Sequence, residues 1–277
     1  MSVARQSHQA IPPDDFRVCI VIPFYNHAGS IAQVVHELKP LAQQVGARCY
    51  LVNDGSSAEC EPVLNELASS EATWLQVINY QPNQGKGAAV MTGMQAAARD
   101  GFTHAIQIDA DGQHRVADVQ TLLQLAQQHP RAMITGYGVF DASVPKSRLY
   151  GRYATHVWVW INTISLQIRD SMCGLRVYPL VPLMKVWQRA QRAWLLHIGK
   201  RMDFDIEILV HLYWFGVRII NVPVPVTYPL DGVSHFKALR DNWQISAAHT
   251  RMFFGMLPRA PGLLLRTLTR SHVSEEI

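Results

Sequence analysis

The sequence is poor in cysteine, and it has none of the cysteine spacings that build zinc or disulfide frameworks. The four cysteines of this 277-residue chain stand singly, without a CxxC pair: Cys19, Cys49, Cys60 and Cys173. Cys19 and Cys49 lie in apolar runs, where a thiol packs as a small hydrophobic group. These features argue against a disulfide scaffold and favour a reducing, cytoplasmic environment.

Long hydrophobic runs are also missing. No window reaches the roughly 18 uninterrupted apolar residues of a membrane-spanning helix, and residues 1–16, expected to be a flexible N-terminus, contain no apolar stretch like that of a signal peptide. A formal net charge of +4 is too small and too dispersed to predict a nucleic-acid partner. Since 48% of the residues are hydrophobic, we expect a domain with a full core over 17–240, followed by a tail over 241–277.

The first half of the chain alternates short apolar runs with longer helical patterns. We expect a helix from Ser30, as its N-cap, to about residue 44. The patterns further predict strands over 17–23, 48–52, 74–79, 103–108 and 132–135, with helices over 58–68, 85–99 and 117–128. This order predicts an α/β fold with a mostly parallel central sheet flanked by helices. Ligands bind such sheets beyond the carboxyl ends of the strands, and polar loops follow three of the predicted strands.

The second half is richer in aromatic residues and ends in an amphipathic tail. We expect helices over 153–168 and 205–215, and an edge strand over 218–226, where prolines interrupt the run. Residues 252–257 and 263–268 are short apolar blocks flanked by arginines. That pattern favours C-terminal amphipathic helices in peripheral contact with the inner face of a membrane. A tail helix docked on the domain's own core is the alternative.

The sharpest chemical motif is Asp109-Ala110-Asp111-Gly112-Gln113, directly after a predicted strand. Two carboxylates two residues apart in a turn can converge on one hard divalent cation, and Gln113 offers a further oxygen ligand. For an isolated pair, an Asx turn that closes the strand is the simpler interpretation. The polar loops at the neighbouring strand ends favour the metal site here.

Two further loops carry groups suited to a nucleotide. Asp54 follows a predicted strand and can accept hydrogen bonds from a base or a ribose, although an ordinary turn explains the same residues. Gly85 and Lys86 precede an alanine-rich helix, where backbone N–H groups and an ammonium can approach a phosphate. The chain has no GxxxxGK[ST] sequence, so this is not a P-loop.

Together these motifs resemble the family 2 glycosyltransferases with the GT-A fold, and within them the polyprenyl-phosphate (dolichol-phosphate) sugar transferase-like branch. The matching stretches occur in family order over about residues 17 to 236: IVIPFYN (20–26), VNDGSS (52–57), NQGKGAA (83–89), QIDADGQH (107–114), SMCGLRVYP (171–179) and FDIEIL (204–209). Each stretch alone is weak, but the joint match is specific. Asn53 stands where the family often has a second aspartate, which bears on donor preference.

The resemblance implies an inverting, metal-dependent transferase that uses a UDP- or GDP-sugar donor with Mg²⁺ or Mn²⁺. It implies that the nucleotide-sugar contacts include Pro23, Tyr25, Asn26, Asp54, Gly85, Lys86 and Asp109. The implied metal ligands are Asp109, Asp111, Gln113 and the late His235. Asp205 occupies the position of the family's late carboxylate, the candidate catalytic base, with Asp203 and Glu207 as neighbouring carboxylates. In helical geometry Asp203 and Glu207 share a face and Asp205 lies on the other side.

The acceptor decides whether a base is needed. A phosphomonoester is already anionic near neutral pH because its second pKa is about 6, whereas a hydroxyl acceptor needs a positioned carboxylate. Arg148 and Arg152 belong to a basic cluster spaced to reach phosphates, and a solvated helix face explains them equally well.

Three functions remain open from the sequence. The leading one is sugar transfer to a lipid-linked or lipid-like acceptor at the cytoplasmic face of a membrane. A nucleotidyltransferase that makes nucleotide-sugars shares a similar core, but it would carry a G-x-G-T-[RK] loop after the first strand, where this chain reads PFYNHAGS. A non-catalytic scaffold that binds nucleotide-sugars is disfavoured by the intact aspartates, although they do not exclude it.

Overall fold

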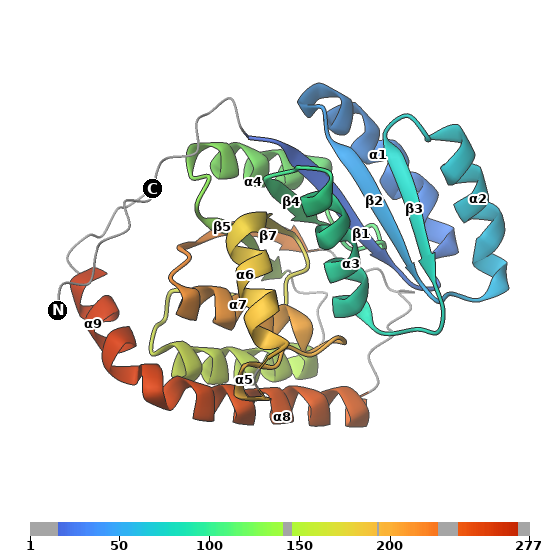
Figure 1. Ribbon diagram of the computed structural model, residues 1–277. Coiled ribbons are helices and arrows are strands. Elements are labelled where there is room, and N and C mark those ends of the chain that lie inside the picture. The colour runs from blue at the N-terminus through green and yellow to red at the C-terminus, as the bar shows by residue number, and fades with distance from the viewer. Residues whose placement is uncertain (1–15, 141–145, 193, 227–237, 271–277) are drawn as a thin grey trace.

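A seven-stranded sheet runs through the molecule in the order β3-β2-β1-β4-β6-β5-β7 (Figure 1). The computed structural model describes residues 16–140, 146–192, 194–226 and 238–270. The strands are β1 (Val18–Phe24), β2 (Arg48–Asp54), β3 (Leu75–Tyr80), β4 (His104–Gln107), β5 (Met133–Phe140), β6 (Arg176–Pro179) and β7 (Ile219–Val226). The longer helices are α1 (Ala28–Val45), α2 (Glu61–Ser70), α3 (Lys86–Arg99), α4 (Val116–Gln128), α5 (Lys146–Thr163), α6 (Leu180–Ala190), α7 (Phe204–Phe215), α8 (Ala238–Met256) and α9 (Ala260–Arg270).

The sheet is mostly parallel, as the alternation of strands and helices predicts. β1 pairs in parallel with β2 and β4, and β5 pairs in parallel with β7. β6 lies antiparallel between β4 and β5. The sequence patterns did not predict β6 or the helix α6 that follows it, because a four-residue strand containing an arginine has no clear alternation. The α/β prediction is confirmed.

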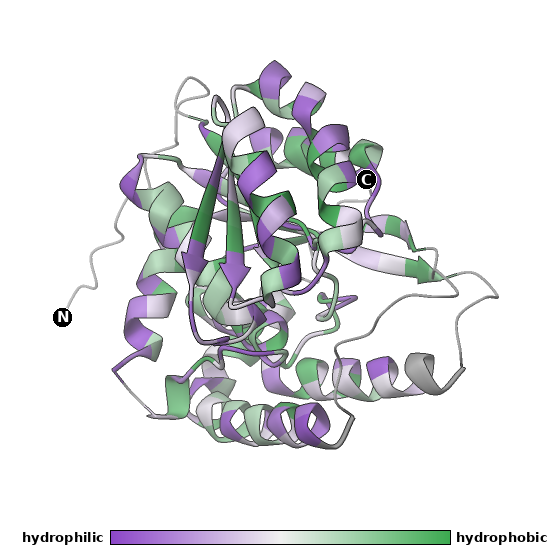
Figure 2. Cartoon of the chain, turned by 90° about the vertical axis from the view of Figure 1, so that its right-hand side faces the viewer, coloured by the Kyte–Doolittle hydropathy of each residue, from purple (hydrophilic) through white to green (hydrophobic). Residues whose placement is uncertain are grey.

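Alternating side chains of β1 supply two separate cores, one on each face of the sheet. Ile20 and Ile22 pack with buried residues of α1, α2 and α4. Cys19 and Val21 point the other way and pack with α3, α6, α7 and α8. The strands are largely hydrophobic, whereas the surrounding helices carry hydrophobic and hydrophilic residues side by side (Figure 2). Because helices cover both faces of the sheet, ligands of such folds bind at the carboxyl ends of the strands.

The first helix begins earlier than expected, and the prediction of Ser30 as its N-cap is wrong. α1 starts at Ala28, with His27 at the N-cap position and no side-chain cap. Ser30 instead lies inside the first turn, where its hydroxyl donates to the carbonyl oxygens of His27 (3.3 Å) and Ala110 (2.6 Å). The serine therefore ties α1 to the loop that follows β4.

The C-terminal helices lie along one side of the molecule, where α8 runs beside α5 (Figure 1). Ala248 and Met252 of α8 are buried in the second core. Arg259 lies over the ring of Trp214, and the guanidinium of Arg266 donates to the carbonyl of Tyr213. Within the described ranges, no helix is both long and apolar enough to cross a bilayer.

Candidate functional site

The centre of the site is a three-residue ion cluster at the carboxyl ends of the parallel strands. The Nζ of Lys86 lies 2.8 Å and 3.0 Å from the two carboxylate oxygens of Asp109, and 2.9 Å from Oδ2 of Asp205. Lys86 keeps 20% and Asp109 23% of the side-chain surface exposed, against 7% for Asp205. The cluster is therefore open to a ligand on the side of Lys86 and Asp109 and closed behind Asp205.

Three elements far apart in the sequence supply these groups. Lys86 is the first residue of α3, Asp109 lies two residues beyond β4, and Asp205 is in the first turn of α7. Gly174 leaves the room that Asp109 occupies, because a Cβ at this glycine would lie 2.0 Å from the carboxylate. Lys86 therefore joins both halves of the fold at one point.

Asp205 is held from behind by a buried polar layer. Its Oδ1 accepts a hydrogen bond from Nε2 of Gln107 (3.1 Å), and Gln107 in turn accepts one from the hydroxyl of Tyr178 (3.0 Å). The fully buried Arg176 donates to the backbone carbonyls of Asp205 (2.6 Å) and Ser171 (2.7 Å). Sequence reasoning missed Arg176, Gln107 and Tyr178 as site residues. The one signal for Arg176 was a charged residue inside an otherwise apolar run.

Opposite charges set the protonation states of the cluster. Burial works against the charge on Lys86, yet the neighbouring Asp109 and Asp205 outweigh it and raise the lysine pKa above its ordinary value. Burial opposes the charge on Asp109 as well, but Lys86 lowers the pKa of Asp109 below its ordinary value. Lys86 and Asp109 are therefore both charged at neutral pH.

Asp111 follows Asp109 by two residues, and its carboxylate has a different environment from those of the ion cluster. Its Oδ1 accepts from the backbone N–H of Gln113 (3.0 Å), which is the Asx turn that the sequence allows. Burial, and then repulsion by Asp109, raise the pKa of Asp111. A cation between two adjacent carboxylates removes such repulsion, so the pair suits a hard divalent ion.

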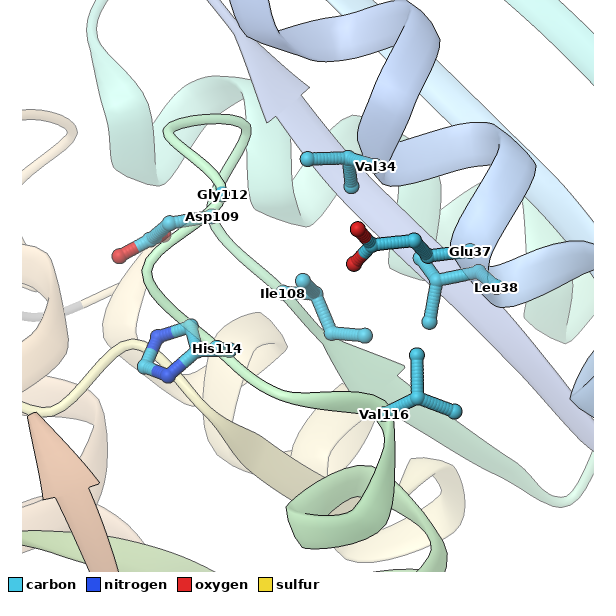
Figure 3. Close-up of a pocket in the computed structure, with 8 residues that line it drawn as sticks. All are labelled: Val34, Glu37, Leu38, Ile108, Asp109, Gly112, His114 and Val116. Carbon is cyan, nitrogen blue, oxygen red and sulfur yellow. The ribbon is translucent and has the colours of Figure 1, made fainter.

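No cluster of three or more His, Cys, Asp or Glu side chains within the described ranges could hold a metal ion. His235, the further predicted ligand, lies outside the described residues. A cavity of about 10 Å³ beside the loop is lined by residues of α1 and of the loop itself, among them Val34, Glu37, Ile108, Asp109 and His114 (Figure 3). This space holds about one water. It is therefore too small for a nucleotide.

Asp54 braces the loop that leads to Lys86. Its carboxylate accepts from the side chain of Asn83 (2.9 Å) and from the backbone N–H groups of Gln84 (2.7 Å) and Gly85 (2.8 Å). Gly85 has φ of 108°, a conformation that favours glycine, and a Cβ there would meet Arg201. Asp54 is 2% exposed, so it reaches a ligand only through this loop's conformation.

The loop after β1 is joined to the loop after β2. Asn26, at φ of 54°, donates from its backbone to the hydroxyl of Ser56 (3.0 Å) and accepts from the N–H of Ser57 (2.9 Å). Pro23 is buried and Tyr25 half-buried at the same end of the sheet. The structure thus gathers the residues predicted after β1, β2 and β4 at one edge.

Arg148 and Arg152, which belong to the predicted basic cluster, both lie on α5. Arg152 pairs with the buried Asp170 and lies 5.0 Å above the ring of Phe140. Arg148 is in the first turn of α5, and its side chain lies outside the described residues. Arg152 is therefore committed to an ion pair in this structure.

The carboxylates of Asp203, Asp205 and Glu207 do not meet at one point, as helical spacing predicts. Glu207 is completely buried, and its Oε1 accepts from Arg251 of α8 at 2.7 Å. Its other oxygen accepts from the backbone N–H of Gly199, and Asp203 accepts from that of Arg201 (3.2 Å). Burial raises the pKa of Glu207 to about 7, although Arg251 opposes the shift. Only Asp205 faces Lys86, so Asp203 and Glu207 are not placed at the ion cluster.

The model of glycosyl transferase family 2 matches residues 19–180, more than half of the chain. The chain belongs to glycosyl transferase family 2. This confirms the resemblance drawn from the sequence, and it covers the loops that carry Asp54, Lys86, Asp109 and Asp111.

Several curated family members that act on polyprenyl phosphates are similar to this chain. The dolichyl-phosphate beta-glucosyltransferase of Saccharomyces cerevisiae is 24% identical over 242 residues, 76% of this chain and 67% of the yeast protein. The undecaprenyl-phosphate 4-deoxy-4-formamido-L-arabinose transferase of Pectobacterium carotovorum is 28% identical over 82% of this chain and 65% of that protein. The polyprenol monophosphomannose synthase of Mycolicibacterium smegmatis is 24% identical over 79% and 80%. The chain therefore spans about two thirds of the first two relatives.

Solved structures confirm the GT-A fold. The glucosyl-3-phosphoglycerate synthase of Mycobacterium tuberculosis, in complex with Mn²⁺, uridine-diphosphate and phosphoglyceric acid, superposes with a TM-score of 0.64 at 13% identity over 88% of this chain and 80% of that one. The complex of the same protein with Mn²⁺ and uridine-diphosphate-glucose superposes with a TM-score of 0.60. At this identity the likeness concerns the fold.

The buried Glu207 predicts a pH-dependent difference in stability between the protein and its Glu207→Gln variant. Because the folded pKa of about 7 exceeds the ordinary 4.5, the unfolded chain releases this proton at lower pH. The wild type should therefore lose stability relative to the variant as pH rises from about 4.5 to about 7, on the order of 3 kcal/mol. Urea unfolding of both proteins at pH 5 and pH 8 measures the difference, and equal pH dependence would contradict the assignment.

Proposed function

We propose that this protein transfers a sugar, with inversion, from a nucleoside-diphosphate sugar to the phosphate of a polyprenyl phosphate. The observation that carries the proposal is the ion cluster of Lys86, Asp109 and Asp205, which lies beside Asp111 at the strand ends of a GT-A fold. Three curated relatives named for dolichyl, undecaprenyl or polyprenol phosphates support the acceptor class.

The donor diphosphate fits the open side of the ion cluster. Lys86 is exposed there, and the loop that Asp54 braces ends at the first turn of α3, whose N–H groups favour an anion. The adjacent Asp109 and Asp111 suit a divalent cation held by one or two carboxylates and completed by substrate phosphates, which is the usual binding mode of Mg²⁺. Mn²⁺ is the other candidate, and the structural neighbour holds it with UDP. When bound, such an ion neutralises charge that develops on the leaving diphosphate.

The reaction would be one in-line displacement. An oxygen of the acceptor phosphate forms a bond to the anomeric carbon, while the bond from that carbon to the nucleoside diphosphate breaks and its electron pair leaves with the diphosphate. The acceptor is already anionic, so it needs no base. Asp205 is bound to Lys86 and Gln107, and we assign it the role of orienting the Lys86 ammonium toward the donor.

The helices on one side of the molecule offer a surface for the membrane that carries such an acceptor. Exposed apolar residues gather on α5, α8 and α9: Tyr150, Tyr153, Trp158, Ile161, Phe254, Leu264, Leu265 and Leu268. Arg251, Arg259 and Arg266 instead contact the protein. Peripheral binding at the cytoplasmic face would therefore rest on apolar contact more than on charge.

A transfer assay tests the function. The purified protein is incubated with a panel of UDP- and GDP-sugars, Mn²⁺ or Mg²⁺, and undecaprenyl or dolichyl phosphate, and glycolipid is detected by mass spectrometry. We expect product from one donor, and Asp111→Asn should lower the rate by at least about 100-fold because several kcal/mol of charge stabilisation are lost. Asp118→Asn, at a carboxylate that pairs with Arg115 on α4, is the matched control. Product formation that is unchanged in Asp111→Asn would refute the assigned metal site.

Vesicle flotation tests the membrane surface. Replacing Leu264, Leu265 and Leu268 together by serine should lower partitioning into phospholipid vesicles at least about tenfold, because each leucine loses more than 1 kcal/mol of apolar burial. Val181→Ser, at a residue of α6 that is 60% exposed, serves as the control. Equal flotation of the triple variant and the wild type would show that this surface does not bind lipid.

A further inference from the structure

A second, larger hollow lies next to the ion cluster, and the donor and metal sites proposed above do not include it. This groove has a volume of about 460 Å³ and lies between the segment 197–203, which precedes α7, and the helix α8. That volume falls within the range of small-molecule sites. Its polar lining includes Gln84, Lys200, Arg201, Asp203, Gln244 and Arg251.

Positive charge predominates in the groove. Lys200, Arg201 and Arg251 line it against the single carboxylate of Asp203. The pair between Arg251 and Glu207 offsets the charge of Arg251 only in part near neutral pH, since burial raises the pKa of Glu207 to about 7. The groove therefore favours an anion.

Two residues that line the groove carry buried polar atoms without a partner among the described residues. Oε1 of Gln244 and Nε of Arg251 are shielded from solvent and make no hydrogen bond to the described part of the chain. Both residues are on α8 and line the same hollow. Buried polar groups without partners are uncommon in folded proteins, and a ligand is one of the groups that satisfies them.

The groove opens beside the reaction centre. Gln84, in its wall, donates its backbone N–H to Asp54 and stands two residues before Lys86. Asp203, also in the wall, stands two residues before Asp205. Trp243 also lines the groove; it is 74% exposed and lies on α8, the helix that also carries Phe254 of the apolar surface.

We propose that this groove holds the phosphate group of the lipid acceptor, with Lys200 and Arg251 as its cationic contacts and Trp243 beside the first part of the hydrocarbon chain. The proposal rests on the function proposed above and assigns the acceptor a place between the apolar helices and the ion cluster. Arginine and lysine are the side chains that bind phosphate best, and an indole ring suits the boundary between a charged group and an apolar chain.

Trp243 provides a readout that does not need catalysis. The chain has seven tryptophans, so the signal of Trp243 is taken as the difference between the wild type and Trp243→Phe. Farnesyl phosphate, a short soluble analogue, should change this difference spectrum at concentrations where farnesol and inorganic phosphate do not. Equal affinity for farnesol would show an apolar groove, and equal affinity for inorganic phosphate would show a site for free phosphate. Either result overturns the proposal.

The same charge reversal is made at one lysine inside the groove and at one outside it. Lys200→Glu should weaken farnesyl phosphate binding by about tenfold or more, since a charged hydrogen bond is lost and repulsion is added. Lys185→Glu makes the same change at an exposed position on α6 outside the groove and should leave binding unchanged. Both exposed variants should fold, which circular dichroism checks. Unchanged affinity in Lys200→Glu would overturn the proposal.

Kinetics separate this proposal from the function on which it rests. In the transfer assay, Lys200→Glu should raise the KM for the acceptor by about tenfold and leave the KM for the donor unchanged. A rise in the donor KM alone would place the groove in the donor site and overturn the acceptor assignment. If the wild type transfers no sugar at all, the proposed function fails, while the Trp243 titration still decides whether the groove binds an amphiphilic phosphate.

Discussion

The ammonium of Lys86 and the two carboxylates that it contacts connect the parts of this fold that are far apart in sequence. Lys86 belongs to the first half of the chain and Asp205 to the second, and their charged groups are 2.9 Å apart. An ion held near a low-dielectric core is costly unless its partners are oriented and their remaining polar groups are satisfied. The layer of Gln107, Tyr178 and Arg176 holds Asp205 in place, and Gly174 leaves the space that the carboxylate of Asp109 occupies. The donor loops and α7 are arranged around this contact.

The ion cluster is accessible to a ligand on one side and enclosed by the protein on the other. Lys86 and Asp109 are partly accessible, whereas Asp205 is enclosed, so the accessible side of the cluster is the one formed by Lys86 and Asp109. The helix α8 reaches the same region through Arg251, which contacts Glu207 two residues beyond Asp205. The C-terminal helices are thus part of the second core and also form one wall of a groove beside the site. In the amphipathic tail expected from the sequence, Arg251, Arg259 and Arg266 contact the protein, and several apolar residues face solvent.

Much of this arrangement could be predicted because it depends on local patterns. Apolar runs located six of the seven strands and most helices, and the position of Asp54 and Asp109 after strands placed them at one edge of the sheet. The other parts of the arrangement depend on contacts between residues that are far apart in the sequence. No pattern indicates that Asp54 would accept bonds from its neighbouring loop, that Lys86 would bridge two carboxylates, or that Glu207 would meet Arg251. β6 was missed because its short run begins with a charged residue and ends in a proline, and Arg176 was missed with it. The family resemblance located Asp205, but only the structure shows its partners.

Calorimetric titration of the protein with UDP and GDP, in the presence of Mn²⁺ and again with a chelator, tests most directly whether the loops around Lys86 form a metal-dependent nucleotide site. The account predicts that one of the two nucleotides binds with Mn²⁺ and that its affinity falls by at least about tenfold without the metal, because the diphosphate then faces Asp109 and Asp111 without a cation. Binding of neither nucleotide by the folded protein, or equal binding with the chelator, would contradict it.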